Sequence, residues 1–246
     1  MKQSYKISTI VMVSLATLIF FFSKPVITQN PEYHQFIDQR SFMGIPNAMD
    51  VLTNILFLIV GALGVRDVMK KNELTKNSWR LFFIGILLIA PGSAYYHWAP
   101  DNFTLVWDRL PMSIGFMALY IAVLAEHVDL KSERFLWWAL LIGLVSVLVW
   151  AVTTDLRLYF WIQYSAFVTI PMILLLFPSR YSHKGWIGYS LLLYGFAKWA
   201  EAKDRMIFAG TCEMLSGHSL KHILAALGLG CLWWMVKARK ENKICH

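Results

Sequence analysis

Eight apolar stretches, each about as long as a membrane-spanning helix, recur along this chain of 246 residues. A helix needs roughly 20 apolar residues to cross about 30 Å of hydrocarbon. The stretches lie near residues 7–22, 48–68, 80–98, 105–126, 134–153, 156–177, 185–203 and 217–236. Charged residues make up only 15% of the chain, against about 25% in a soluble domain. We therefore predict an all-α integral membrane protein.

The first stretch differs from the seven that follow. The later stretches are joined mostly by short connections, which predicts a seven-transmembrane-helix bundle over residues 40–236. One additional N-terminal transmembrane helix is predicted within residues 1–24, and a basic cytoplasmic tail over residues 237–246. Lys2 and Lys6 before an apolar run also fit a signal peptide, but Ser23-Lys24-Pro25 lacks the small residues of a cleavage site. An uncleaved signal anchor is the prediction, and a cleaved signal peptide is the alternative.

Basic residues predict how the chain is oriented. The formal net charge is +8, and short loops rich in Lys and Arg remain in the cytoplasm. With the N-terminus inside, the basic clusters at residues 70–80 and 237–243 both fall inside, and the loops at 98–104 and 203–216 fall outside. No basic run is interleaved with aromatic residues, as a nucleic-acid surface requires, so no nucleic-acid partner is expected. The oligomeric state is not predicted.

Five polar residues in the apolar stretches are predicted to lie at one depth in the membrane. Ser93 and His97 are four residues apart near the end of the third stretch, and His218 and His222 have the same spacing at the start of the last. Residues four apart share one face of a helix. Asp108 lies about one turn into the fourth stretch. Polar side chains in membrane helices are costly and usually face a cavity or a partner, so a common site near the external side is predicted.

These residues supply the parts of a catalytic zinc site. Three histidines provide three ligands and leave a fourth position for water, whose pKa zinc lowers to about 7. Asp108 can accept a proton from that water, and Ser93 can donate a hydrogen bond to an oxyanion. The predicted chemistry is hydrolysis of an amide or ester.

Each residue also has a structural interpretation. An H-x-x-x-H pair such as His218 and His222 arises by chance, and Ser93 can bond back to its own helix. Asp108 can be a helix N-cap, with Pro111 then in the first turn.

Two further polar groups have open interpretations. Asn47, Asp50 and Asn54 lie on one helical face and either support the site or, for Asn47, cap a helix. A second group lies at spacings of three and four, which is typical of ion pairs, and consists of Lys198, Glu201, Asp204 and Arg205. Support of a histidine by Glu201 or Asp204 is the alternative.

The order of these motifs resembles the alkaline ceramidases, which belong to a superfamily of seven-helix membrane hydrolases that includes the adiponectin receptors. The resemblance covers about residues 40–236. Its motifs are Ser93 with His97, the run WDRLPM at residues 107–112, and His218 with His222.

The resemblance implies zinc held by His97, His218 and His222, with Asp108 activating water and Ser93 stabilising the oxyanion while a ceramide amide is hydrolysed. Asp204 is similar to a recurrent acid of the family. Eukaryotic alkaline ceramidases also carry a calcium site made by acidic residues. Here Glu32, Asp38 and Asp50 are spaced differently, so calcium is doubtful.

The predicted function is a zinc-dependent hydrolase that cleaves the amide bond of ceramide or a similar N-acyl lipid to a free fatty acid and an amine. A bacterial inner membrane is the expected location, with the active site towards the periplasm. The alternatives are a receptor-like or transport protein with a structural zinc site, and a metal-free scaffold whose histidines pair with Asp108. A structural zinc site would close with Asp108 as its fourth ligand.

Overall fold

The computed structural model describes residues 2–242, and residues 243–246 of the predicted basic tail lie outside the described residues. Within that range every regular element is a helix, and no strand is formed. Each of the eight predicted stretches contains a helix. Their bounds are α1 (Gln3–Phe22), α2 (Ala48–Leu52) with α3 (Ile55–Met69), α4 (Lys76–Trp98), α5 (Asn102–His127), α6 (Leu136–Thr153), α7 (Arg157–Leu176), α8 (Gly185–Ala202) and α10 (Gly217–Ala238). Short helices at Pro31–His34, Leu130–Phe135 and α9 (Asp204–Gly210) lie in the connections.

Seven of the described helical segments are long and apolar enough to cross a membrane. They are α1, α2 together with α3, α4, α5, the segment Leu130–Thr153, α7 and α10. α8 is not among them, and it carries Lys198 and Glu201 near its C-terminal end. The number and composition of these helices indicate a multi-pass membrane protein.

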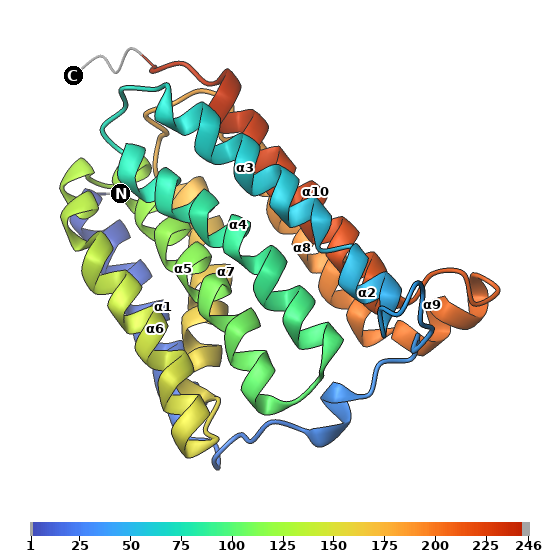
Figure 1. Cartoon of the computed structure of the whole chain (residues 1–246). Helices are drawn as coiled ribbons and strands as arrows, with labels where there is room; N and C mark the ends of the chain where they lie inside the picture. The colour runs from blue at the N-terminus through green and yellow to red at the C-terminus, as the bar shows by residue number, and fades with distance from the viewer. Residues whose placement is uncertain (1, 243–246) are drawn as a thin grey trace.

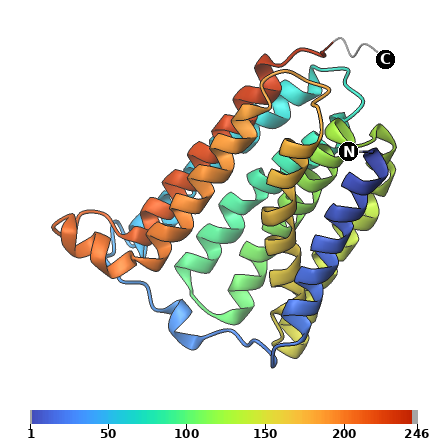
Figure 2. The same cartoon turned by 180° about the vertical axis from the view of Figure 1, so that it is seen from behind.

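The helices form one elongated bundle (Figure 1). α4 packs against both α3 and α5, and α10 packs against α3 and α8. α1 lies along α7, on the side seen in Figure 2. Ser14 and Ser165 join these two helices through their hydroxyl groups at 2.9 Å, and Nε1 of Trp161 donates to the Ser14 carbonyl at 3.1 Å. The N-terminal helix is thus a packed part of the structure.

Two glycines allow close helix contacts near the predicted site. A Cβ on Gly92 of α4 would lie 2.2 Å from the Trp107 carbonyl oxygen of α5. A Cβ on Gly217, at the start of α10, would lie 2.2 Å from the Ala200 carbonyl oxygen of α8. Because only glycine lacks a Cβ, these positions let the backbones of α4 and α5, and of α8 and α10, approach closely.

A buried ionic network joins helix ends at the end of the bundle away from the predicted site. Arg239, just after α10, forms an ion pair with Glu73 and contacts Glu126 of α5 at 2.8 Å. Glu126 also accepts hydrogen bonds from Nε1 of Trp79 at 2.6 Å and the Thr75 hydroxyl at 2.8 Å. Because buried charges need paired partners, this network fixes the ends of α4, α5 and α10 relative to one another. The start of α1 and the end of α10 lie at this same end (Figure 1).

Candidate metal centre

The three predicted histidines converge at the end of the bundle away from that network. His97 comes from α4, and His218 and His222 come from the first turns of α10. They are buried, with exposed fractions of 1%, 5% and 3%. The ring centroids of His97 lie 4.9 Å from those of both His218 and His222, which are 5.1 Å from each other. One potential ligand atom from each residue lies within 4.8 Å of the others, so the group can hold a metal ion.

A hydrogen bond to the Thr53 hydroxyl indicates the tautomer of His222. The Thr53 hydroxyl donates its single proton to the Met49 carbonyl at 2.8 Å and lies 2.8 Å from Nδ1 of His222. It therefore accepts from Nδ1, which must carry the ring proton. Nε2 of His222 is left with a free lone pair, the state that a metal ligand needs.

His97 is held from its backbone, while its ring has an unused nitrogen. Nδ2 of Asn47 donates to the His97 carbonyl at 2.8 Å. Nδ1 of His97 is buried and has no hydrogen-bond partner among the described residues. A buried polar atom without a partner is costly, and a bound ion or water nearby would relieve that cost. The donor set and this atom both fit a metal site.

The environment of His218 contains a residue that the sequence analysis did not single out. Nζ of Lys221 lies 2.9 Å from Nε2 of His218 and 3.0 Å from a carboxylate oxygen of Glu201. Asp204 accepts the backbone N–H of His218 at 3.0 Å rather than its ring. Burial raises the pKa of Asp204 above its usual range, although hydrogen bonds from the His218 and Gly217 backbones oppose the shift.

Asp50 anchors the start of the helix that carries two of the histidines. Ser216 is the N-cap of α10, and its hydroxyl accepts the Ser219 backbone N–H at 2.9 Å. Asp50 of α2 accepts the Ser219 hydroxyl at 2.6 Å and the Ser216 hydroxyl at 3.4 Å. The supporting role proposed for the Asn47 and Asp50 face therefore has direct contacts. Asn47 does not cap α2 with its side chain.

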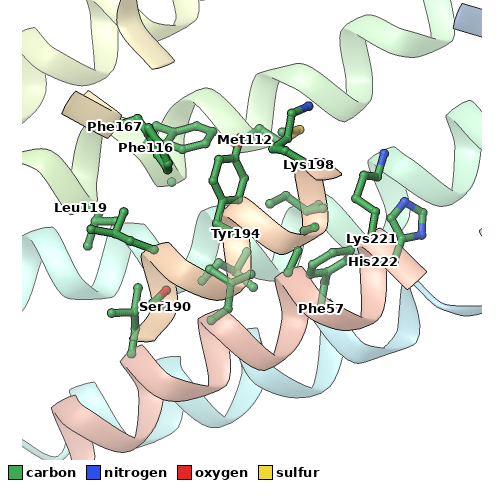
Figure 3. Close-up of a pocket in the computed structure, with 18 of the residues that line it drawn as sticks. Phe57, Met112, Phe116, Leu119, Phe167, Ser190, Tyr194, Lys198, Lys221 and His222 are labelled. Carbon is green, nitrogen blue, oxygen red and sulfur yellow. The ribbon is translucent and has the colours of Figure 1, made fainter. Parts of the chain in front are cut away.

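Ser93 and Asp108 line one cavity together with His222, which also belongs to the histidine group. The cavity has a volume of about 180 Å³, and its lining includes Ser93, Asp108 and His222. Figure 3 shows His222 beside Lys221 in this lining. Ser93 of α4 and Asp108 of α5 thus face a common space. The structure brings together all five residues that the sequence predicted for this site.

The interpretation of Asp108 as a helix N-cap is wrong. α5 begins at Asn102, and Asp101 caps it by accepting the Thr104 backbone N–H at 2.7 Å. Asp108 lies well within the helix, and Pro111 is inside the helix rather than in its first turn. The carboxylate of Asp108 is therefore available to the cavity.

The segment before α2 covers the histidines, which the sequence did not indicate. The Phe36 ring centroid lies 4.6 Å from that of His97 and 4.9 Å from that of His218. Tyr33 lines the cavity and stacks on Tyr96 at 6.4 Å. Nδ1 of His34 lies 3.0 Å from the Tyr96 hydroxyl.

The three acids of the doubtful calcium site have separate partners. Asp38 pairs with Arg40, whose Nε and Nη2 lie 2.7 and 2.6 Å from its two oxygens. Burial favours a raised pKa for Asp38, but the hydrogen bonds and charge of Arg40 outweigh it and lower that pKa. Asp50 binds the two serines of α10, and Glu32 is exposed.

Gly92→Ala is expected to lower stability by about 1–3 kcal/mol, the usual cost of overpacking. The added methyl would meet backbone of Trp107, which has no side-chain freedom to move, so α4 and α5 must separate beside Ser93 and Asp108. Gly188→Ala on α8 is the matched control, because its Cβ would meet nothing within 4 Å. Thermal unfolding in detergent compares the two, and an unchanged midpoint for Gly92→Ala would contradict the close contact.

Comparison of the chain with protein-family models, curated proteins and solved structures finds no match. The residues of the site and their geometry are therefore the basis for assigning a function.

Proposed function

We propose that this protein is a zinc-dependent hydrolase that cleaves the amide bond of ceramide or a similar N-acyl lipid, as a relative of the alkaline ceramidases. The observation that carries the proposal is the set of ligands. Three buried histidines converge, and no carboxylate or thiol among the described residues joins them. Three protein ligands with an open position are typical of catalytic zinc, whereas structural sites are closed by four.

Zinc held by His97, His218 and His222 would lower the pKa of a water molecule to about 7 and polarise the substrate carbonyl. Asp108 lines the adjoining cavity and is in position to accept the proton that the water releases. Ser93 can donate a hydrogen bond to the oxygen of the attacked carbonyl. Asp108 then passes the proton to the leaving amine.

The apolar part of the cavity supports a lipid substrate. Besides Ser93 and Asp108, the cavity is lined by aromatic and aliphatic side chains, which include Phe57, Phe116, Leu119 and Phe167 (Figure 3). Such walls favour an acyl chain, since each buried methylene contributes about 0.8 kcal/mol. A soluble peptide offers no comparable chain.

Turnover is expected to fall by about tenfold for every two methylenes removed from the acyl chain, once the remaining chain is short enough to leave the cavity unfilled. The measurement is release of fatty acid from ceramides of increasing acyl length in detergent, by protein of known zinc content. Equal turnover of short and long chains, or turnover that survives removal of the metal, would overturn the proposed function.

A receptor-like or transport protein with structural zinc is the alternative function. Such a site would use Asp108 as a fourth ligand, but Asp108 is not a member of the ligand group. The geometry therefore favours the hydrolase.

We also propose that the metal centre lies on the external side of the membrane, which is the periplasm in a bacterial inner membrane. The basic clusters near Lys71 and Lys240 lie at the opposite end of the bundle, and positive loops stay in the cytoplasm. A cysteine at Asn102 should react with an impermeant reagent added to intact cells, and one at Lys71 should not. The reverse pattern would invert the orientation.

A further inference from the structure

Two lysines and a glutamate in the cavity lining form a charged cluster. The proposed chemistry does not use this cluster. Lys198 and Glu201 come from α8, Lys221 comes from α10, and all three line the cavity beside His222. Figure 3 shows the two lysine side chains extending towards the same side as the His222 ring. Charged groups in the lining of a mostly apolar cavity are expensive unless they are paired with a partner or bind a ligand.

Glu201 cannot satisfy both lysines. One of its oxygens accepts from Lys221 at 3.0 Å, and the other is paired with Lys198. An ammonium group has three N–H donors, so one carboxylate shared by two lysines leaves several donors without an acceptor among residues 2–242. Lys221 has one further contact, to Nε2 of His218 at 2.9 Å.

A metal at this nitrogen would release Lys221. A ring nitrogen has a single lone pair, so Nε2 of His218 can hold the Lys221 ammonium or a metal ion but not both. If a metal ion binds to this nitrogen, Lys221 keeps its hydrogen bond to Glu201 and loses its contact with His218. Because Lys221 lines the cavity together with Asp108 and His222, its freed donors would be available to a ligand there.

The charge of the cavity also favours a negative ligand. The charged side chains that line it are Asp108, Lys198, Glu201 and Lys221, whose formal charges cancel. Asp50 and Asp204 lie outside this lining and are engaged by hydroxyl and backbone donors at the start of α10. A divalent metal therefore adds uncompensated positive charge to a space with mostly apolar walls.

We propose that Lys198 and Lys221 bind an anionic group, a carboxylate or a phosphate, on the polar part of the lipid close to the amide. This inference rests on the proposed function and narrows its substrate to anionic N-acyl lipids, such as N-acyl amino acids or phosphorylated ceramides. Charge-assisted hydrogen bonds from two ammonium groups are the stabilising contacts.

A binding experiment on a variant with impaired hydrolysis tests this inference independently of catalysis. Zinc-loaded Asp108→Asn protein is titrated, by tryptophan fluorescence, with a long-chain N-acylglycine and its neutral glycinamide, and with ceramide 1-phosphate and ceramide. We expect each anionic lipid of the matching type to bind about 10–100-fold more tightly than its neutral partner. Preference in the glycine pair identifies a carboxylate ligand, and preference in the ceramide pair identifies a phosphate.

Lysine variants assign the effect to the cluster. Lys221→Gln should reduce the anionic-to-neutral ratio to near one, and Lys198→Gln should reduce it in part. Lys203→Gln is the matched control, because Lys203 is an exposed lysine at the same end of the bundle that does not line the cavity. It should leave the ratio unchanged. A ratio also compares two ligands on one protein, so a moderate loss of folded protein does not alter it.

Two results would overturn the anionic site. One is equal binding of the anionic and the neutral lipid of each pair by the Asp108→Asn protein with its lysines unchanged. The other is an anionic preference that persists in both Lys221→Gln and Lys198→Gln. The wild-type protein is assayed in parallel for hydrolysis of all four lipids. An anionic preference without any hydrolysis would reject the proposed function and keep the binding site, whereas hydrolysis without the preference would reject the binding site alone.

Discussion

Asp108→Asn is expected to keep its zinc and to lose about 10²–10⁴-fold in turnover, the usual contribution of a general base. An amide has nearly the shape of the carboxylate but cannot accept a proton from water. Asp108 lines the cavity and lies outside the histidine group, so its loss should remove chemistry rather than a ligand. Turnover of a long-chain N-acyl lipid and zinc content per chain are measured on the same preparation.

Asp101→Asn provides the control for this variant. Asp101 is on the same helix but only caps its start, and asparagine caps helices equally well. It should retain turnover. Ser93→Ala should cost no more than one oxyanion donor, roughly 10²–10³-fold. Loss of zinc from Asp108→Asn would identify the residue as a ligand and would support the structural-zinc alternative.

His222→Ala is expected to weaken zinc binding by much more than tenfold and to abolish turnover. It removes one of three ligands, and loss of a group that merely orients a ligand already costs about 10–100-fold in metal affinity. Thr53→Val tests that lesser effect, because valine cannot accept the proton of Nδ1 of His222. Zinc retained at increasing chelator concentration ranks the variants.

The control for metal loss is His183→Ala. His183 is exposed at the other end of the bundle and lies outside the ligand group. It should bind zinc as the unmodified chain does. Full zinc content in the His222→Ala protein would remove His222 from the site and would leave the proposed hydrolase without its third ligand.

Much of the fold could be predicted because each membrane helix depends on the composition of one continuous stretch of sequence. Every apolar stretch of about 20 residues contains a helix, since backbone polar groups in hydrocarbon must be satisfied within the segment. The interruption at Thr53 and Asn54 was not predicted, because it depends on side chains. The Thr53 hydroxyl and the Asn54 amide bond to the carbonyls of the preceding turn, between α2 and α3.

The candidate ligands, too, could be identified from residue spacing and polarity alone. The i, i+4 spacing puts His218 and His222 on one helical face, and polarity at membrane depth distinguishes them and His97 from other histidines. Lys221 carried the same signal, as a charged residue between two histidines in an apolar helix. Its partner could not be predicted, because Glu201 is 20 residues away on another helix.

How these residues meet depends on the packing of helices that are distant in the sequence. The contact of Gly92 with Trp107 brings Ser93 towards Asp108, and the packing of Phe36 over the histidines brings in a segment with no periodic pattern. Asn47 bonds to the carbonyl of His97 across 50 positions of sequence. The difference lies in how far apart in the sequence the interacting residues are. Helix formation and membrane burial depend on neighbouring residues, whereas the ligand geometry and the charge of the cavity depend on contacts between distant helices.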